Sequence, residues 1–165
     1  MIIRGRVIKY GDDINTDVIF PGRYLAITEA EEMAKHAMED LDPDFLEKVK
    51  ERNILVAGKN FGCGSSREQA AICLKYAGVK AIVAKSFARI FFRNAINQGI
   101  PIVESPKAIE FIKDGDEIEI DLEKGEIKNL STGKTFSFKP LPTFIRDIIN
   151  AGGLVESMKK RLSRS

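Results

Sequence analysis

The chain has 165 residues, of which 44% are hydrophobic and 30% charged, and these values predict one soluble domain with a buried core. The net charge of +2 is too small to indicate nucleic acid or an anionic membrane as a partner. No apolar run approaches the ~20 residues that cross a bilayer, the charged start lacks the apolar centre of a secretory signal, and two cysteines fit reduced thiols, so we expect a cytoplasmic protein.

The N-terminal part of the chain predicts a strand, a loop and two helices. Residues 2–10 alternate between apolar and polar side chains as a strand does, and residues 11–17 form a polar loop rich in turn formers. After further irregular chain, helical patterns follow over residues 28–40 and 42–52. The second helix ends in a basic run, which is expected to be exposed.

The middle of the chain alternates between strands and helices. Buried strands are predicted over residues 53–57, 80–84 and 100–104, with helices over residues 66–77 and 87–97 between them. This β-α-β-α-β order predicts parallel strands with right-handed crossovers, and therefore an α/β fold. Ligands of such sheets bind beyond the carboxyl ends of the strands, so a functional site should be sought there.

Local signals mark some of the helix ends. Thr28 followed by Glu31 has the spacing of a capping box, which predicts the start of the helix over residues 28–40. Ser86 is expected to cap the helix over residues 87–97, and Gly99 is expected to end it.

The C-terminal third changes to a period of two. Apolar residues alternate between residues 118 and 138, which predicts antiparallel strands that cover the core. Two closing helices are expected over residues 142–151 and 154–161, with Gly152-Gly153 between them. The basic tail, about residues 158–165, is expected to be a solvated and fraying end.

The turn from Gly58 to Glu68 is the most informative segment, because it combines glycines, hydroxyls and a guanidinium between a strand and a helix. Ser65 and Glu68 have the spacing of a second capping box, which places Ser66 and Arg67 in the first helical turn. Backbone N–H groups and the helix dipole at that position favour a carboxylate, a phosphate or an alkoxide. Arg67 can add a bidentate contact to a carboxylate.

Three familiar sites do not fit this turn. A dinucleotide fingerprint needs a third glycine where Arg67 stands, and a P-loop needs Ser or Thr where Asn60 follows Gly58-Lys59. A serine activated by histidine would depend on His36, the only histidine, which is expected to be a surface or packing residue.

Two motifs in register resemble the swivel domain of the aconitase superfamily. One runs from Asn60 to Glu68, and the other from Lys85 to Phe91 with Asn94 beyond it. The likeness extends upstream to residues 15–19 and 21–25, and in length and start point the chain is similar to the free-standing small subunits of 3-isopropylmalate dehydratases. The resemblance implies one domain over residues 1–165. It would be a β/β/α swivelling fold with a parallel β-α-β-α-β core and additional antiparallel strands.

The resemblance also implies an activity and a partner. Such a domain closes over a [4Fe-4S] cluster that a separate large subunit holds, and the hetero-oligomer moves a hydroxyl between neighbouring carbons of a small dicarboxylate by dehydration and rehydration. This chain would bind no cofactor itself, since Cys63 and Cys73 are too few to hold an iron-sulfur cluster unaided. It would be inactive alone.

Four residues receive roles from the family motif. The catalytic serine falls on Ser66, its partner serine, also a substrate contact, on Ser65, and the carboxylate-binding arginine on Arg67, while Asp17 matches an active-site aspartate. Simpler readings stand beside these roles. By position alone Ser65 serves equally well as a helix cap, Ser66 and Arg67 as exposed first-turn residues, and Asp17 as an ordinary turn former.

Other residues of the two motifs favour structural roles. Cys63 is expected to be a small packed residue, and Arg89 is expected to pair with helix carboxylates rather than with substrate. The phenylalanines Phe87, Phe91 and Phe92, at helical spacing, are expected in the core.

The resemblance also implies that substrate choice depends on Leu25, Ala26 and Ile27 within a flexible specificity loop, about residues 23–42. Relatives that act on tricarboxylates place an arginine where Ala26 stands. An unpaired extra carboxylate would be disfavoured by several kcal/mol, whereas an isopropyl group gains about 0.8 kcal/mol per buried methylene-sized unit. The resemblance therefore implies interconversion of 2-isopropylmalate and 3-isopropylmalate in leucine biosynthesis. Homoaconitase, a dehydratase of methylated malates and a regulatory anion-binding module remain alternatives.

Overall fold

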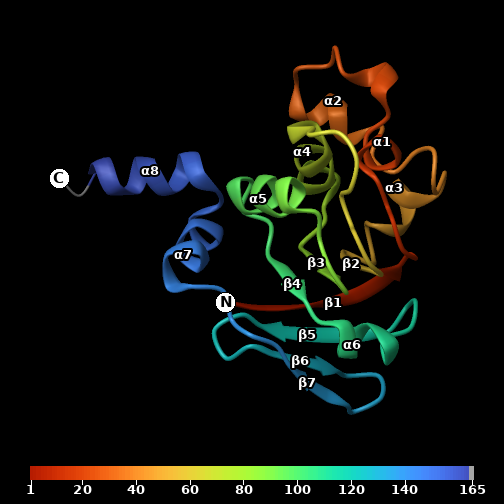
Figure 1. Ribbon diagram of the computed structural model, residues 1–165, viewed down its shortest axis with the longest axis vertical. Coiled ribbons are helices and arrows are strands. Elements are labelled where there is room, and N and C mark those ends of the chain that lie inside the picture. Colours follow the sequence, from red (N-terminus) through yellow and green to blue (C-terminus); the bar gives the residue numbers. More distant parts are fainter. Residues whose placement is uncertain (164–165) are drawn as a thin grey trace.

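A seven-stranded sheet organises the computed structural model, which describes residues 1–163 (Figure 1). The strands lie in the order β4-β3-β2-β1-β5-β6-β7. Their bounds are β1 Ile2–Lys9, β2 Ile54–Ala57, β3 Ala81–Ala84, β4 Ile102–Glu104, β5 Glu117–Asp121, β6 Glu126–Asn129 and β7 Thr135–Ser137.

Strands β1 to β4 are parallel and form the predicted half of the sheet. Every residue of β2 and β3 is buried, as expected of parallel strands covered on both faces. Helices α4 (Glu68–Ala77) and α5 (Arg89–Asn97) connect β2 to β3 and β3 to β4, and they contact each other. The parallel β-α-β-α-β core predicted from the sequence is confirmed.

Strands β5 to β7 are antiparallel, as predicted, but they do not cover the core. They continue the same sheet beyond β1, because the first half of β1 pairs with β5 while its second half pairs with β2. Ile118 and Ile120 of β5 are buried, and the glutamates between and before them are half-exposed. One face of this antiparallel half therefore belongs to the core.

Shorter helices surround the sheet. They are α1 Thr16–Ile19, the 3₁₀ helix η1 Gly22–Tyr24, α2 Ala30–Ala34, α3 Phe45–Lys48 and α6 Pro106–Glu110. The helices α1 and α6 were not expected, and α1 lies where a loop was predicted. No helix within the described residues has the length and apolar character needed to cross a bilayer.

The helix predicted over residues 28–40 is wrong in length and in its cap. Helix α2 ends at Ala34, and its N-cap is Glu29, which makes no side-chain capping bond. Met38 adopts a φ of 58°, outside the helical region, and its N–H donates to the Ile19 carbonyl at 2.8 Å. A tertiary bond thus replaces the helical one. The next helix is also shorter than predicted, since α3 covers only residues 45–48.

Ser86 does not cap α5 as predicted. Its Oγ accepts from the N–H of Asn60 at 2.9 Å, and α5 begins only at Arg89. Gly99 lies two residues beyond the end of α5 with a φ of +77°, which agrees with its predicted role as a stop.

The closing helices are confirmed as α7 (Thr143–Ala151) and α8 (Leu154–Ser163), and Figure 1 shows both standing to one side of the sheet. Gly152 and Gly153 form the joint between them. A side chain at Gly99 would overlap the Gly152 backbone, and Lys75 Nζ donates to the Gly152 carbonyl at 3.0 Å. The joint is therefore packed against the body. Residues 158–163 of the predicted fraying tail are helical, and residues 164–165 lie outside the described residues.

Candidate active site

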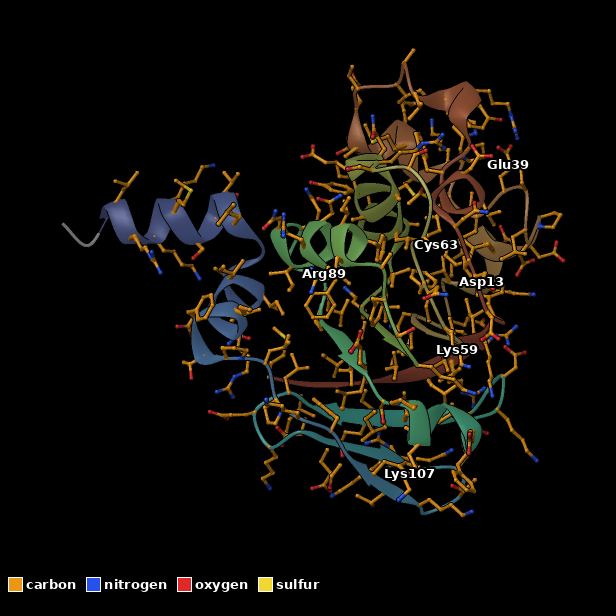
Figure 2. All side chains as sticks on the ribbon, viewed as in Figure 1. Asp13, Glu39, Lys59, Cys63, Arg89 and Lys107 are labelled. Carbon is orange, nitrogen blue, oxygen red and sulfur yellow. The ribbon has the colours of Figure 1, made fainter. Side chains whose placement is uncertain are left out.

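Loops that follow the parallel strands meet at one edge of the sheet. The loop after β1 bonds to the glycine turn after β2, since the Asp13 N–H donates to the Lys59 carbonyl at 2.8 Å; Figure 2 shows these two residues near each other. The turn is bonded in the same way to the segment after β3, where the Ala88 N–H donates to the Phe61 carbonyl at 3.0 Å. Hydrogen bonds thus join the loops at the carboxyl ends of β1, β2 and β3 to one another.

Thr16 fixes the glycine turn from the side of α1. Its N–H donates to the Cys63 carbonyl and its Oγ1 to the Ser65 carbonyl, both at 2.8 Å, and the residue is 3% exposed. This role of Thr16 was not predicted from the sequence. Asn15 could have indicated the start of α1 at Thr16, because asparagine is a preferred N-cap residue and its side chain here accepts from the Val18 N–H.

Gly62 allows α5 to approach the turn. The residue has a φ of +83°, and a methyl group at its Cα would overlap the Cβ and ring of Phe91. The rings of Phe61 and Phe91 pack edge to face with centroids 5.1 Å apart. Because position 62 has no side chain, the first turns of α5 form one wall of the site.

Ser65 is not a helix cap, so the predicted capping box is wrong. Helix α4 begins at Glu68, and its N-cap is Arg67, in an extended conformation (φ −134°, ψ 108°) without a side-chain capping bond. Ser66 and Arg67 therefore precede the helix instead of lying in its first turn. The hydroxyls of Ser65 and Ser66 are exposed and have no hydrogen-bond partner among the described residues, and both remain beside the positive end of α4.

Arg67 and Asp17 form an ion pair between the turn and α1. Arg67 Nη1 donates to Asp17 Oδ1 at 2.8 Å and to the Phe20 carbonyl at 3.0 Å, and the Gly22 N–H donates to the same carboxylate oxygen at 2.9 Å. The hydrogen bond from Arg67, and next that from Gly22, lower the pKa of Asp17 below its usual value. Asp17 is therefore ionised at neutral pH, and the pair is lost only as the pH falls through this lowered pKa.

A cavity of about 320 Å³ lies against this turn. It is lined by Thr16, Gly62, Gly64, Ser65, Arg67, Ala88, Arg89, Ile90, Phe91 and Asn94. Ser66 and Asp17 are exposed and do not line it. The structure thus brings Arg67, which follows Ser65 and Ser66 in the chain, into contact with Asp17, and it adds a wall from α5, whose residues were predicted to be structural.

The predicted specificity residues lie on the chain that follows η1. Leu25 and Ala26 are exposed and Ile27 is half-buried against the core, and none of the three lines the cavity. They connect to the site through η1, whose first residue, Gly22, contacts Asp17.

Packing holds both ends of the segment over residues 23–42. Arg23 donates to both carboxylate oxygens of Asp40, at 2.9 and 2.6 Å. His36 stacks on Tyr24 with ring centroids 3.7 Å apart, which confirms its predicted packing role. The segment therefore folds back on itself, and its two ends lie close together.

The remaining predictions for this region hold in part. Phe87 and Phe91 are buried as expected, whereas Phe92 is only partly buried against the core. Cys63 is half-buried, and burial raises the pKa of the Cys73 thiol.

Among residues 1–163, no group of three or more His, Cys, Asp or Glu side chains is placed to hold a metal ion.

Comparisons with known proteins identify similar chains. The model of the aconitase C-terminal domain matches residues 12–107. The 3-isopropylmalate dehydratase small subunit of Thermodesulfovibrio yellowstonii is 55% identical over 163 residues, which are 99% of this chain and 97% of that protein. The small subunit of Aquifex aeolicus is 57% identical over 164 residues, 99% of this chain and 98% of that protein.

A solved structure extends the likeness to the fold. The crystal structure of 3-isopropylmalate dehydratase from Methanocaldococcus jannaschii matches with a TM-score of 0.91 and 52% identity, over 98% of this chain and 96% of that chain. The expected α/β fold of the aconitase C-terminal domain is therefore confirmed.

Proposed function

We propose that this chain, which belongs to the family of 3-isopropylmalate dehydratase small subunits, supplies the catalytic serine to a hydro-lyase that interconverts 2-isopropylmalate and 3-isopropylmalate in leucine biosynthesis. Near full-length identities of 55% and 57% support the reaction. One structural observation carries the assignment of the site: the ion pair of Arg67 with Asp17 joins the serine turn to the chain that leads into the proposed specificity loop.

The residues of the turn suit the proton transfer that the reaction needs. Dehydration removes a proton from carbon and a hydroxyl from the neighbouring carbon, and rehydration returns both in exchanged positions. We propose that Ser66 Oγ accepts this proton, because its alkoxide is stabilised by the Arg67 guanidinium and by the positive end of α4. The Lewis acid required by the leaving hydroxyl is what an iron-sulfur cluster supplies when bound.

The other three residues bind and orient the substrate in this proposal. The Ser65 hydroxyl donates a hydrogen bond to substrate. Arg67 binds a carboxylate through Nη2 and Nε, which remain available because its bonds to Asp17 and Phe20 both use Nη1. Asp17 fixes the direction of Arg67. Its lowered pKa makes it a poor proton donor at neutral pH, so its contribution to catalysis is positioning.

The substrate class can be tested directly. Steady-state rates of the complex reconstituted with a large subunit should be highest for isopropylmalate, compared with citrate, homocitrate and methylated malates. A preference for homocitrate or for a methylated malate would move the assignment to another dehydratase of the superfamily. Ligand binding by the chain alone, with no turnover after mixing, would favour a regulatory anion-binding module.

A substitution at Ala26 tests the proposed specificity loop. Ala26→Arg is expected to raise the ratio of kcat/KM for citrate over isopropylmalate by about 10- to 100-fold, because a charge-assisted hydrogen bond to the extra carboxylate contributes ~1.5–3 kcal/mol. Glu29→Arg, which adds the same side chain to the N-cap of α2 three residues later, is the control. An unchanged ratio in the Ala26 variant would show that specificity is set elsewhere.

Exposed apolar side chains on α8 support a protein partner. No residue of this helix is buried, and Leu154, Val155 and Met158 share one face, the latter two 63% and 55% exposed. A ten-residue helix is marginal in water without packing. Since α8 carries Lys159, Lys160 and Arg161 against one acidic residue, two copies would bring like charges together. We therefore assign this face to the large subunit.

The helix face can be tested without disturbing the catalytic turn. Val155→Gln combined with Met158→Gln is expected to weaken binding of the large subunit about 10²-fold, because two apolar side chains lose ~1.5 kcal/mol or more each of burial. Lys159→Gln with Lys160→Gln is the matched control on the same helix. Affinity measured by titration with the large subunit decides the matter. If the double glutamine variant instead dissociates a dimer formed by the free chain, the face is occupied by a second copy of this chain.

We further propose that the chain acts as one swivelling domain in the cytoplasm, in a hetero-oligomer whose large subunit holds a [4Fe-4S] cluster. The small-subunit names of the relatives and the two free cysteines support this setting.

A further inference from the structure

The cavity beside the serine turn has two arginines among its lining residues. They are Arg67 and Arg89, the latter at the start of α5 and labelled in Figure 2. The closeness of Gly62 to Phe91 sets α5 against the turn and so brings Arg89 to this cavity.

The two arginines differ in how much of each is already engaged. Nη1 of Arg67 bonds to Asp17 and to the Phe20 carbonyl, and its side chain is 16% exposed. Arg89 is exposed and makes no hydrogen bond or ion pair within the described residues, so the predicted pairing with helix carboxylates is wrong. Helix α5 has no acidic residue in its first turn, and the positive end of a helix disfavours a cation there. Arg89 therefore has all its donors available for an anion.

The proposed substrate needs a second cationic contact. An isopropylmalate carries two carboxylates, and each requires compensating donors when it leaves water. Asn94, a neutral donor, also lines the cavity. A neighbouring cavity of about 490 Å³ also touches Arg89. Its lining combines Arg93 and Glu104 with apolar side chains, so a bound anion there would face the Glu104 carboxylate.

We propose that Arg89 is the second carboxylate-binding residue of this site, which binds one carboxylate of a branched dicarboxylate while Arg67 binds the other. This inference rests on the proposed function, because that function supplies the dicarboxylate. Arg89 is thus a substrate contact contributed by α5, separate from the serine turn and from the proposed specificity loop.

The test compares two arginines on one helix. Arg89→Met in the reconstituted complex is expected to raise KM for isopropylmalate about 10- to 100-fold with a smaller change in kcat, and Arg89→Lys to recover part of the loss. Arg93→Met is the matched control, since Arg93 is exposed one turn later and lines only the neighbouring cavity. Its KM should stay within about twofold of the wild type.

A binding measurement separates this inference from the proposed function. In complexes made inactive by Ser66→Ala, calorimetric titration of 3-isopropylmalate should show a weaker Kd with Arg89→Met and an unchanged Kd with Arg93→Met. Equal effects of the two variants, or an Arg89 variant that changes only affinity for the large subunit, would overturn the role of Arg89. A wild-type complex that fails to turn over isopropylmalate would instead overturn the proposed function.

Discussion

An alanine in place of Ser66 is expected to lower kcat of the reconstituted complex by about 10³-fold, with KM for isopropylmalate changed much less. The substitution removes one oxygen, the proposed acceptor of the carbon-bound proton. Ser66 is exposed, and its hydroxyl has no partner among the described residues, so the fold should be unaffected. Steady-state rates at saturating large subunit measure the loss, and thermal unfolding of the free chain checks that stability is retained.

Ser65→Ala is the matched control for Ser66, because the neighbouring hydroxyl is also exposed and free. Its loss should be smaller, about 10- to 100-fold, since Ser65 is assigned a hydrogen bond to substrate and no proton transfer. A larger loss at Ser65 than at Ser66 would exchange the two roles. An undiminished rate for the Ser66 variant would remove the basis of the proposed mechanism.

Arg67→Met is expected to lower kcat/KM by about 10²- to 10³-fold. The variant loses charge-assisted bonds to a substrate carboxylate and the positive charge that favours the Ser66 alkoxide. It also leaves the Asp17 carboxylate without its guanidinium partner, so the pKa of Asp17 should rise toward its ordinary value. Titration of the Asp17 carboxyl by NMR in the free chain measures this second effect without the large subunit.

Arg4→Met provides the control for loss of a surface ion pair. Arg4 Nε lies 2.9 Å from Glu117 Oε1, on the antiparallel half of the sheet; the Arg4 side chain is 64% exposed and that of Glu117 37%. Such pairs contribute at most about 1 kcal/mol to stability, and kcat/KM should be unchanged. If the Arg4 and Arg67 variants lose activity equally, the Arg67 effect is one of general stability and not of binding.

The sequence predicted the parallel core well because periodicity and burial agree there. The runs of β2 and β3 are apolar at every position, and a strand buried on both faces permits no other pattern. The antiparallel strands were predicted for a similar reason. The position of these strands in the sheet was not predicted, because alternation shows which face of a strand is buried and not which strand it pairs with.

Helix ends were predicted less well, because capping signals compete with tertiary bonds. Ser65 has the right spacing to cap α4, yet its carbonyl accepts from Thr16, and Arg67 is still extended, so the helix begins only at Glu68. Ser86 likewise uses its Oγ for the N–H of Asn60 in another loop. In each case the partner lies far away in sequence, where local spacing carries no information.

The residues of the proposed site were predicted from family motifs and not from geometry. Asp17 and Arg67 are 50 residues apart, and only the folded chain places Oδ1 and Nη1 at 2.8 Å. Arg89 was assigned to structure because nothing in its local sequence shows that α5 faces the serine turn. That contact depends on Gly62, whose role becomes visible only when the ring of Phe91 is in place.

The missing side chain at Gly62 also has a consequence for engineering. A single added carbon there would displace α5, so the inner wall has no room for variation. Leu25 and Ala26 are exposed on the chain that follows η1, outside the packed interior. Mutant libraries that probe the proposed specificity loop should therefore diversify those two codons and keep the glycine constant, because changes there leave the packing of α5 against the serine turn intact.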